Sequence, residues 1–250
     1  MLAFTLADIE TALAMIFWPM VRILSMLSVA PVIGHRSIPV RAKIGLSALI
    51  AFAAAGSTPA VPALFDACAP LVLIQQMLIG FAMGFTVRLV FAAVELAGDM
   101  VGLQMGLSFA TFVDPVTAGQ TPLIGTFIGL CGMLMFLALD GHLLIIAGTI
   151  SSFEAAPAGP SFFAGVDWAR LASLGAWIFA LGLQMALPLL AAMLTINLTL
   201  GVMSRAAPQL NLFSVGFPLT VLSGIILLTL FIPQVLAPLP GALQKSLQVF

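Results

Sequence analysis

Two short stretches of this 250-residue chain hold residue types that enzymes use for nucleophilic attack and proton transfer. Residues 106–110 (GLSFA) superficially resemble the tight turn that presents a serine nucleophile in hydrolases. The final glycine of that motif is absent, and no strand is predicted before it. Residues 140–142 (DGH) are explained more simply as a turn between apolar segments than as a proton relay. A serine hydrolase that uses Ser108 and His142 is therefore disfavoured.

Other catalytic motifs are missing from the sequence. It contains neither a phosphate-binding Gly-Lys-Ser/Thr loop nor a His-Glu-x-x-His pair. Cys68 and Cys131 lie in different apolar segments without the spacing of metal ligands. We therefore expect no enzyme activity, no catalytic residues, no metal site and no cofactor.

The composition is that of a polytopic membrane protein. Hydrophobic residues make up 62% of the chain and charged residues only 7%, against about 25% in soluble domains. Residues 171–244 contain one charged side chain, Arg205, and the runs on both sides of it exceed the about 20 residues that cross a bilayer as helix. The net charge of -1 offers no basic surface for nucleic acid.

Apolar length and helix breakers predict an all-α membrane protein with about six hydrophobic helices arranged in hairpins. The expected helices are residues 11–33, 44–56, 68–97, 122–139, 171–200 and 214–236. No internal repeat is evident, so residues 1–250 are expected to form a single integral membrane domain.

The distribution of basic residues predicts the membrane topology. Residues 34–43 hold three of the eight basic side chains, and Arg205 lies between the last two predicted helices. Basic loops favour the cytoplasm, so the acidic, Pro-rich loop at residues 57–66 is expected on the other side. Six crossings would then place both termini outside.

Residues 98–122 form the most unusual stretch, apolar but dense in glycine. Gly98, Gly102 and Gly106 are four residues apart and would form a ridge for close helix packing. Asp114-Pro115 disfavours further helix. Irregular backbone at membrane depth occurs only where protein covers it or a cavity adjoins it. We therefore expect this segment to line or obstruct a passage, or to be clamped between subunits.

Bulky and small side chains alternate irregularly in this segment, so it could fill a passage by shape alone. The predicted plug-like loop consists of Met105, Gly106, Leu107, Ser108, Phe109, Ala110, Thr111, Phe112, Val113, Asp114 and Pro115. For the glycines alone, ordinary helix packing is the simpler interpretation.

Charged side chains inside apolar segments are costly unless they are paired or hydrated. The candidates are Arg22, Arg88, Glu95 and Asp99. Arg88, Glu95 and Asp99 share one helix face, and we expect a buried charge network among them. A structural ion pair is favoured over a proton-translocating carboxylate.

Several sequence runs occur in a characteristic order, at residues 30–41, 97–115, 136–142, 152–153 and 204–219. Together they closely resemble the FliR family of flagellar export proteins, over about residues 20 to 230. The combination of the runs, rather than any one of them, makes the resemblance specific.

The resemblance implies a non-enzymatic subunit of the flagellar type III protein export gate in the bacterial inner (cell) membrane, at the flagellar basal body. Its expected partners are FliP-like, FliQ-like, FlhB-like and FlhA-like subunits, membrane lipid and exported unfolded flagellar proteins. In this hetero-oligomeric helical assembly, partner subunits cover much of the apolar surface. The resemblance also assigns a channel-plug role to the matching residues of the loop, with residues 111–113 included by position only.

Three alternatives remain open. The injectisome counterpart of virulence secretion shares the expected architecture, although residues 204–209 and 215–218 look more flagellar. Broken helices would also suit a small-solute secondary transporter, but repeat symmetry and polar site residues are lacking. A purely structural scaffold would require residues 98–122 to be static packing.

Overall fold

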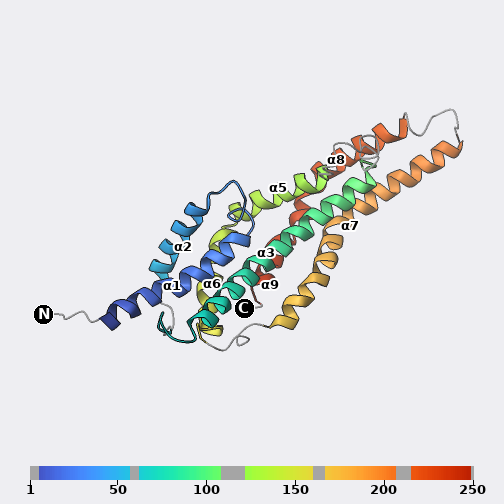
Figure 1. Cartoon of the computed structure of the whole chain (residues 1–250). Coiled ribbons are helices and arrows are strands. Elements are labelled where there is room, and N and C mark those ends of the chain that lie inside the picture. The colour runs from blue at the N-terminus through green and yellow to red at the C-terminus, as the bar shows by residue number, and fades with distance from the viewer. Residues whose placement is uncertain (1–5, 57–61, 108–121, 160–166, 207–214, 249–250) are drawn as a thin grey trace, which may run out of the picture. The chain divides into compact units, whose positions relative to one another are not determined.

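The computed structural model describes residues 6–56, 62–107, 122–159, 167–206 and 215–248. All regular structure in these ranges is helical (Figure 1). The helices are α1 (Leu6–Val29), α2 (Val40–Ala54), α3 (Ala69–Gln104), α5 (Leu123–Ala138), α6 (Gly141–Ala155), α7 (Trp168–Ala206), α8 (Phe217–Leu236) and α9 (Leu239–Leu247). The predicted all-α membrane fold is confirmed.

Four stretches of helix in the described residues are long and apolar enough to cross a membrane. They are Asp8–Val29, Ala69–Gln104, Trp168–Ala206 and Phe217–Leu247. The pair α5 and α6, bent by 67° at a short break, would make a fifth span if it counts as one.

Each of the six predicted helices is present, but the expectation of six crossings is not supported. Helix α2 has 15 residues, a length of about 22 Å, which is shorter than a hydrocarbon core of about 30 Å. The predicted fourth helix ends at Ala138, and the chain turns into α6, which the sequence analysis did not predict. Asp140 makes this turn in the left-handed conformation, with φ 53°.

The chain divides into two compact units. The first contains residues 1–89, 136–175 and 243–250, and the second contains residues 90–135 and 176–242. Both units combine segments from distant parts of the sequence, so neither corresponds to one continuous stretch of chain. The expectation of a single domain stays a prediction.

In the first unit, α1 packs closely against the beginning of α3 through glycine. A Cβ atom on Gly84 would lie 2.6 Å from the carbonyl oxygen of Met26, and one on Gly80 would overlap the carbonyl oxygen of Arg22. Because only hydrogen fits at these positions, the backbones of α1 and α3 approach each other as in other membrane helix pairs with small residues. Helix α2 runs back alongside α1 (Figure 1).

In the second unit, glycine again sets the contacts of α3. A Cβ atom on Gly98 would lie 2.6 Å from the Cα atom of Gly125 in α5. A Cβ atom on Gly182 of α7 would lie 3.0 Å from the carbonyl oxygen of Ala93. The end of α3 is thus packed against two other helices at backbone distance, which fixes the position of the helix end.

Candidate functional site

The candidate site is the start of the loop that follows α3. The amide of Gly106 donates to the carbonyl of Leu103 at 3.0 Å, and the amide of Leu107 donates to the carbonyl of Gly102 at 3.2 Å. Gly106 has a φ of 78°. This pair of bonds and the left-handed glycine form a Schellman motif. The helix therefore ends at a defined residue and the chain leaves it in a defined direction.

Helices α7 and α8 hold this helix end in place. Met105 is fully buried, and a Cβ atom on Gly224 would lie 2.5 Å from its Cγ atom. Asn197 Nδ2 donates to the carbonyl of Gln104 at 3.0 Å, and Thr220 Oγ1, which donates to the carbonyl of Phe217 at 2.8 Å, lies 3.5 Å from the carbonyl of Met105. Carbonyls at a helix C-terminus have no partner within the helix, so Asn197 satisfies one of them from a neighbouring helix.

Asn197, Thr220 and Gly224 are not among the site residues predicted from the sequence. An amide side chain within the long apolar run of α7 is a signal that could have identified Asn197, because such a group needs a partner in the membrane. Thr220 and Gly224 carry no comparable signal, since both are common in membrane helices.

Only the first three residues of the predicted plug-like loop are described, namely Met105, Gly106 and Leu107. The others lie outside the described residues: Ser108, Phe109, Ala110, Thr111, Phe112, Val113, Asp114 and Pro115. The role of the loop as a plug stays a prediction.

The three glycines of the predicted ridge have different environments. Gly98 lies at backbone distance from Gly125. A Cβ atom on Gly102 would be 3.4 Å from the Ile124 side chain, close to ordinary van der Waals contact. Gly106 lies past the end of the helix, where its positive φ rather than its small size is required.

The predicted charge network is spread along α3. Arg88 and Glu95 are exposed on the chain and Asp99 is half-buried. In the second unit, the side chains of Glu95 and Asp99 lie over Gly129 and Gly125 of α5. Asp99 Oδ1 is enclosed without a hydrogen-bond partner among the described residues. The pairing of Arg88 with these carboxylates stays a prediction.

The first unit contains a buried cluster of polar side chains around Arg22, whose members other than Arg22 were not predicted from the sequence. Arg22 is fully buried, and its Nε donates to Gln76 Oε1 at 2.8 Å. One terminal nitrogen donates to Ser152 Oγ at 2.9 Å and the other to the carbonyl of Ala156 at 2.6 Å. The guanidinium carbon lies 3.7 Å from the centre of the Phe153 ring. One side chain thus joins α1, α3 and the end of α6.

The cluster continues through a second glutamine. Gln76 Nε2 donates to Gln75 Oε1 at 3.1 Å, and the same oxygen accepts the amide of Gly159 at 3.1 Å. The sequence predicts Arg22 as an intramembrane charge but does not identify its partners. All the partners described for Arg22 are neutral. The guanidinium group is held by hydrogen bonds to three acceptors and by a cation–π contact with Phe153.

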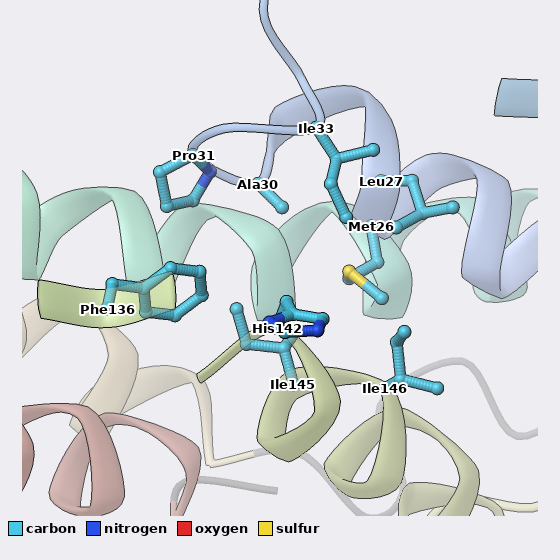
Figure 2. Close-up of a pocket in the computed structure, with 9 residues that line it drawn as sticks. All are labelled: Met26, Leu27, Ala30, Pro31, Ile33, Phe136, His142, Ile145 and Ile146. Atoms are coloured by element: carbon cyan, nitrogen blue, oxygen red, sulfur yellow. The ribbon is translucent and has the colours of Figure 1, made fainter. Parts of the chain in front are cut away.

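An apolar pocket in the first unit encloses part of His142 (Figure 2). It is lined by Met26, Leu27, Ala30, Pro31, Ile33, Phe136, His142, Ile145 and Ile146. The Nδ1 atom of His142 is enclosed and has no hydrogen-bond partner in the described part of the chain. No carboxylate or hydroxyl lines the pocket, so it lacks the groups that would orient an imidazole for proton transfer.

Metal-binding side chains do not converge either. Within the described ranges, no group of three or more histidine, cysteine or acidic residues could hold a metal ion. The residues described at the end of α3 pack against neighbouring helices and end the helix.

The comparison with protein families decides the assignment of the chain. The family model described as bacterial export proteins, family 1, matches residues 13–246. The chain belongs to this family. Curated relatives also match most of its length.

Three of the relatives named flagellar biosynthetic protein FliR show the range of similarity. The relative from Escherichia coli (strain K12) is 44% identical over 221 residues, which cover 88% of this chain and 84% of the relative. The relative from Pectobacterium carotovorum subsp. carotovorum is 42% identical, covering 94% of this chain and 90% of the relative. The relative from Bacillus subtilis (strain 168) is 31% identical, covering 90% and 87%. The resemblance found in the sequence runs is confirmed.

Proposed function

We propose that this protein is a non-enzymatic subunit of the flagellar type III protein export gate in the bacterial inner membrane. In this proposal it assembles with FliP-like and FliQ-like subunits into a channel for unfolded flagellar proteins, next to FlhA-like and FlhB-like subunits. Membership of the bacterial export protein family and the flagellar names of its relatives support the assignment. The same names favour a flagellar over an injectisome role.

The anchored end of α3 is the observation that carries the gating part of the proposal. The Schellman motif at Gly106 and the buried Met105 fix where the following loop begins and which way it leaves the helix. A loop that closes a channel needs such a rigid base, because a mobile base would spread the loop over many positions. The loop itself can then be displaced while its attachment stays in place.

The outer faces of α7 and α8 support the assembly part of the proposal. Large apolar side chains on these helices are more than 50% exposed on the chain: Phe179, Leu187, Leu194, Leu198, Val202, Leu222, Ile226 and Leu230. Lipid or other subunits must cover such surfaces, because contiguous apolar patches are costly in water. All eight of these side chains belong to the second unit, which also holds the start of the loop.

Purification from the native membrane tests the proposal. An affinity-tagged chain, expressed at its normal level, is expected to bring FliP-like and FliQ-like subunits with it. A clean deletion strain is expected to lose filaments and export together. A chain that purifies alone and binds a small solute, or a deletion strain with normal filaments and no second gene copy, would refute the proposal in favour of a transporter.

A further inference from the structure

Helix α2 has an inverted distribution of polar and apolar side chains. Its buried face, which packs on α1, consists of Lys43, Ser47, Ala51 and Ala54. Most of its large apolar side chains are exposed instead: Val40, Ile44, Leu46, Leu49 and Phe52. Surface helices of soluble proteins have the opposite arrangement. The outer face of α2 is therefore built for an apolar environment.

The length of α2 limits what that environment can be. Its 15 residues extend about 22 Å, so the helix cannot cross the about 30 Å hydrocarbon core alone. It is also absent from the helices that qualify as membrane spans among the described residues. An exposed apolar face of this length would reach from one headgroup region past the bilayer midplane but not to the opposite headgroups.

Basic side chains gather at one end of this face. Arg36 and Arg41 are both exposed, in the loop before α2 and in its first turn. Lys43 is turned inward, where its Nζ donates to the carbonyls of Gly34 at 3.0 Å and His35 at 3.4 Å. The lysine thus fixes the loop between α1 and α2 and leaves the two arginines free to interact with a partner outside the chain.

The other end of the α1–α2 hairpin is acidic. Asp8 and Asp66 are exposed there, and Glu10 Oε1 accepts the amide of Phe65 at 3.3 Å. A hairpin with one basic and one acidic end matches the charge asymmetry of a membrane whose cytoplasmic leaflet carries anionic lipid. A protein partner would not require this asymmetry, and charged residues are depleted from the centres of protein interfaces.

We propose that α2 is a lipid-contacting surface, in which Phe52 and its apolar neighbours pack against acyl chains while Arg36 and Arg41 bind the phosphates of anionic phospholipids. The two arginines hold the start of α2 at the headgroups of the cytoplasmic leaflet. The inference rests on the membrane location of the proposed function but not on protein export. Its failure would leave the deletion and purification results unaffected.

Brominated phospholipids provide the test. The assembled complex with Phe52→Trp is reconstituted in vesicles of phosphatidylcholine and phosphatidylglycerol, with bromine on the acyl chains of one lipid at a time. The parent complex supplies the background fluorescence of the native tryptophans. We expect quenching of Trp at position 52 by both lipids, with stronger quenching when phosphatidylglycerol carries the bromine.

The arginine variants separate charge attraction from simple burial. Arg36→Gln with Arg41→Gln is expected to abolish the preference for phosphatidylglycerol, with a loss of about fivefold in relative lipid affinity for each arginine. Arg36→Lys with Arg41→Lys is the charge-matched control and keeps most of the preference. Raising the salt concentration should weaken the preference in the Phe52→Trp complex that retains both arginines, so this measurement does not depend on the folding of the arginine variants.

Two outcomes would overturn the inference. No quenching by either lipid in the assembled complex would mean that a protein subunit covers α2. An unchanged preference in the glutamine variant would mean that the arginines do not recognise lipid.

Discussion

The side chain of Met105 lies in the space beside Gly224 that a side chain at position 224 would otherwise occupy. A Cβ atom there would be 2.5 Å from Met105 Cγ and 2.7 Å from its Cε. The methionine is fully buried and directly precedes the glycine that ends the α3 cap. The base of the proposed gating loop is therefore held by shape complementarity between α3 and α8.

Adding one methyl group at this contact should loosen the base of the loop. Gly224→Ala is expected to destabilise the packing by about 1 to 3 kcal/mol, because Met105 must move away from α8. The melting temperature of the purified complex should fall. Gly201→Ala is the matched control, since nothing lies within 4 Å of a Cβ atom there. Equal melting temperatures for the two variants would show that Met105 adapts at no cost.

The Schellman cap makes a prediction about residue type at position 106. The φ of 78° suits glycine and is tolerated by asparagine, whereas a β-branched residue is strained there by about 1 to 3 kcal/mol. Gly106→Val should therefore reduce export much more than Gly106→Asn. Export is measured as secreted flagellar protein at equal complex abundance. Comparable loss in both variants would indicate that size, and not backbone conformation, matters at this position.

Arg22 should be far more sensitive to truncation than an exposed arginine. Arg22→Ala leaves Gln76, Ser152 and the end of α6 without their donor, and each buried acceptor that loses its partner is expected to cost about 1 to 3 kcal/mol. Protease resistance and abundance of the full chain in membranes report the loss. Arg170→Ala, at an exposed side chain, is the control.

A second pair of variants tests whether the hydrogen bonds of Arg22 contribute to the stability of the chain. Arg22→Met retains apolar volume, and adding Gln76→Leu removes one of the abandoned polar groups. The double variant should be more stable than Arg22→Met alone, because a buried group without a partner costs about 1 to 3 kcal/mol. A double variant that is less stable than Arg22→Met would contradict the interpretation that Gln76 is destabilising without its donor.

The charges on α3 should differ in their tolerance of substitution. Arg88→Leu is expected to disturb assembly less than Glu95→Lys or Asp99→Lys, since it removes a charge instead of reversing one. Asp99→Lys should be the most harmful, because Asp99 is half-buried and its side chain lies over Gly125. Co-purification with the partner subunits ranks the three variants. Wild-type assembly in all of them would mean that these side chains face water.

The sequence could predict features that depend on local composition. The apolar runs predicted the membrane helices, but the helix predicted for residues 68–97 ends too early, since α3 continues to Gln104. Helix α6 was not predicted, because residues 140–142 were interpreted only as a turn between apolar segments. The helix is tied to the rest of the first unit by contacts such as that of Ser152 with Arg22.

Contacts between distant segments could not be predicted. Gln76 and Ser152 are 54 and 130 residues from Arg22, and Asn197 is 93 residues from Gln104. A single sequence identifies a polar group that needs a partner but not which of many polar groups supplies it. The same limit applies to Gly224, which becomes informative only once Met105 is seen beside it.

Membrane conductance tests the central claim that the loop after α3 closes a protein-conducting path. Two variants are compared with wild type at equal complex abundance: one with the loop shortened between Leu107 and Pro122, and one with Phe109→Ala and Phe112→Ala. Truncation of a buried aromatic residue typically removes about 3 to 5 kcal/mol of packing. We therefore expect both variants to assemble and to leak ions, while Gly201→Ala does not. Unchanged conductance with intact complexes would contradict the account and leave the loop as structural packing.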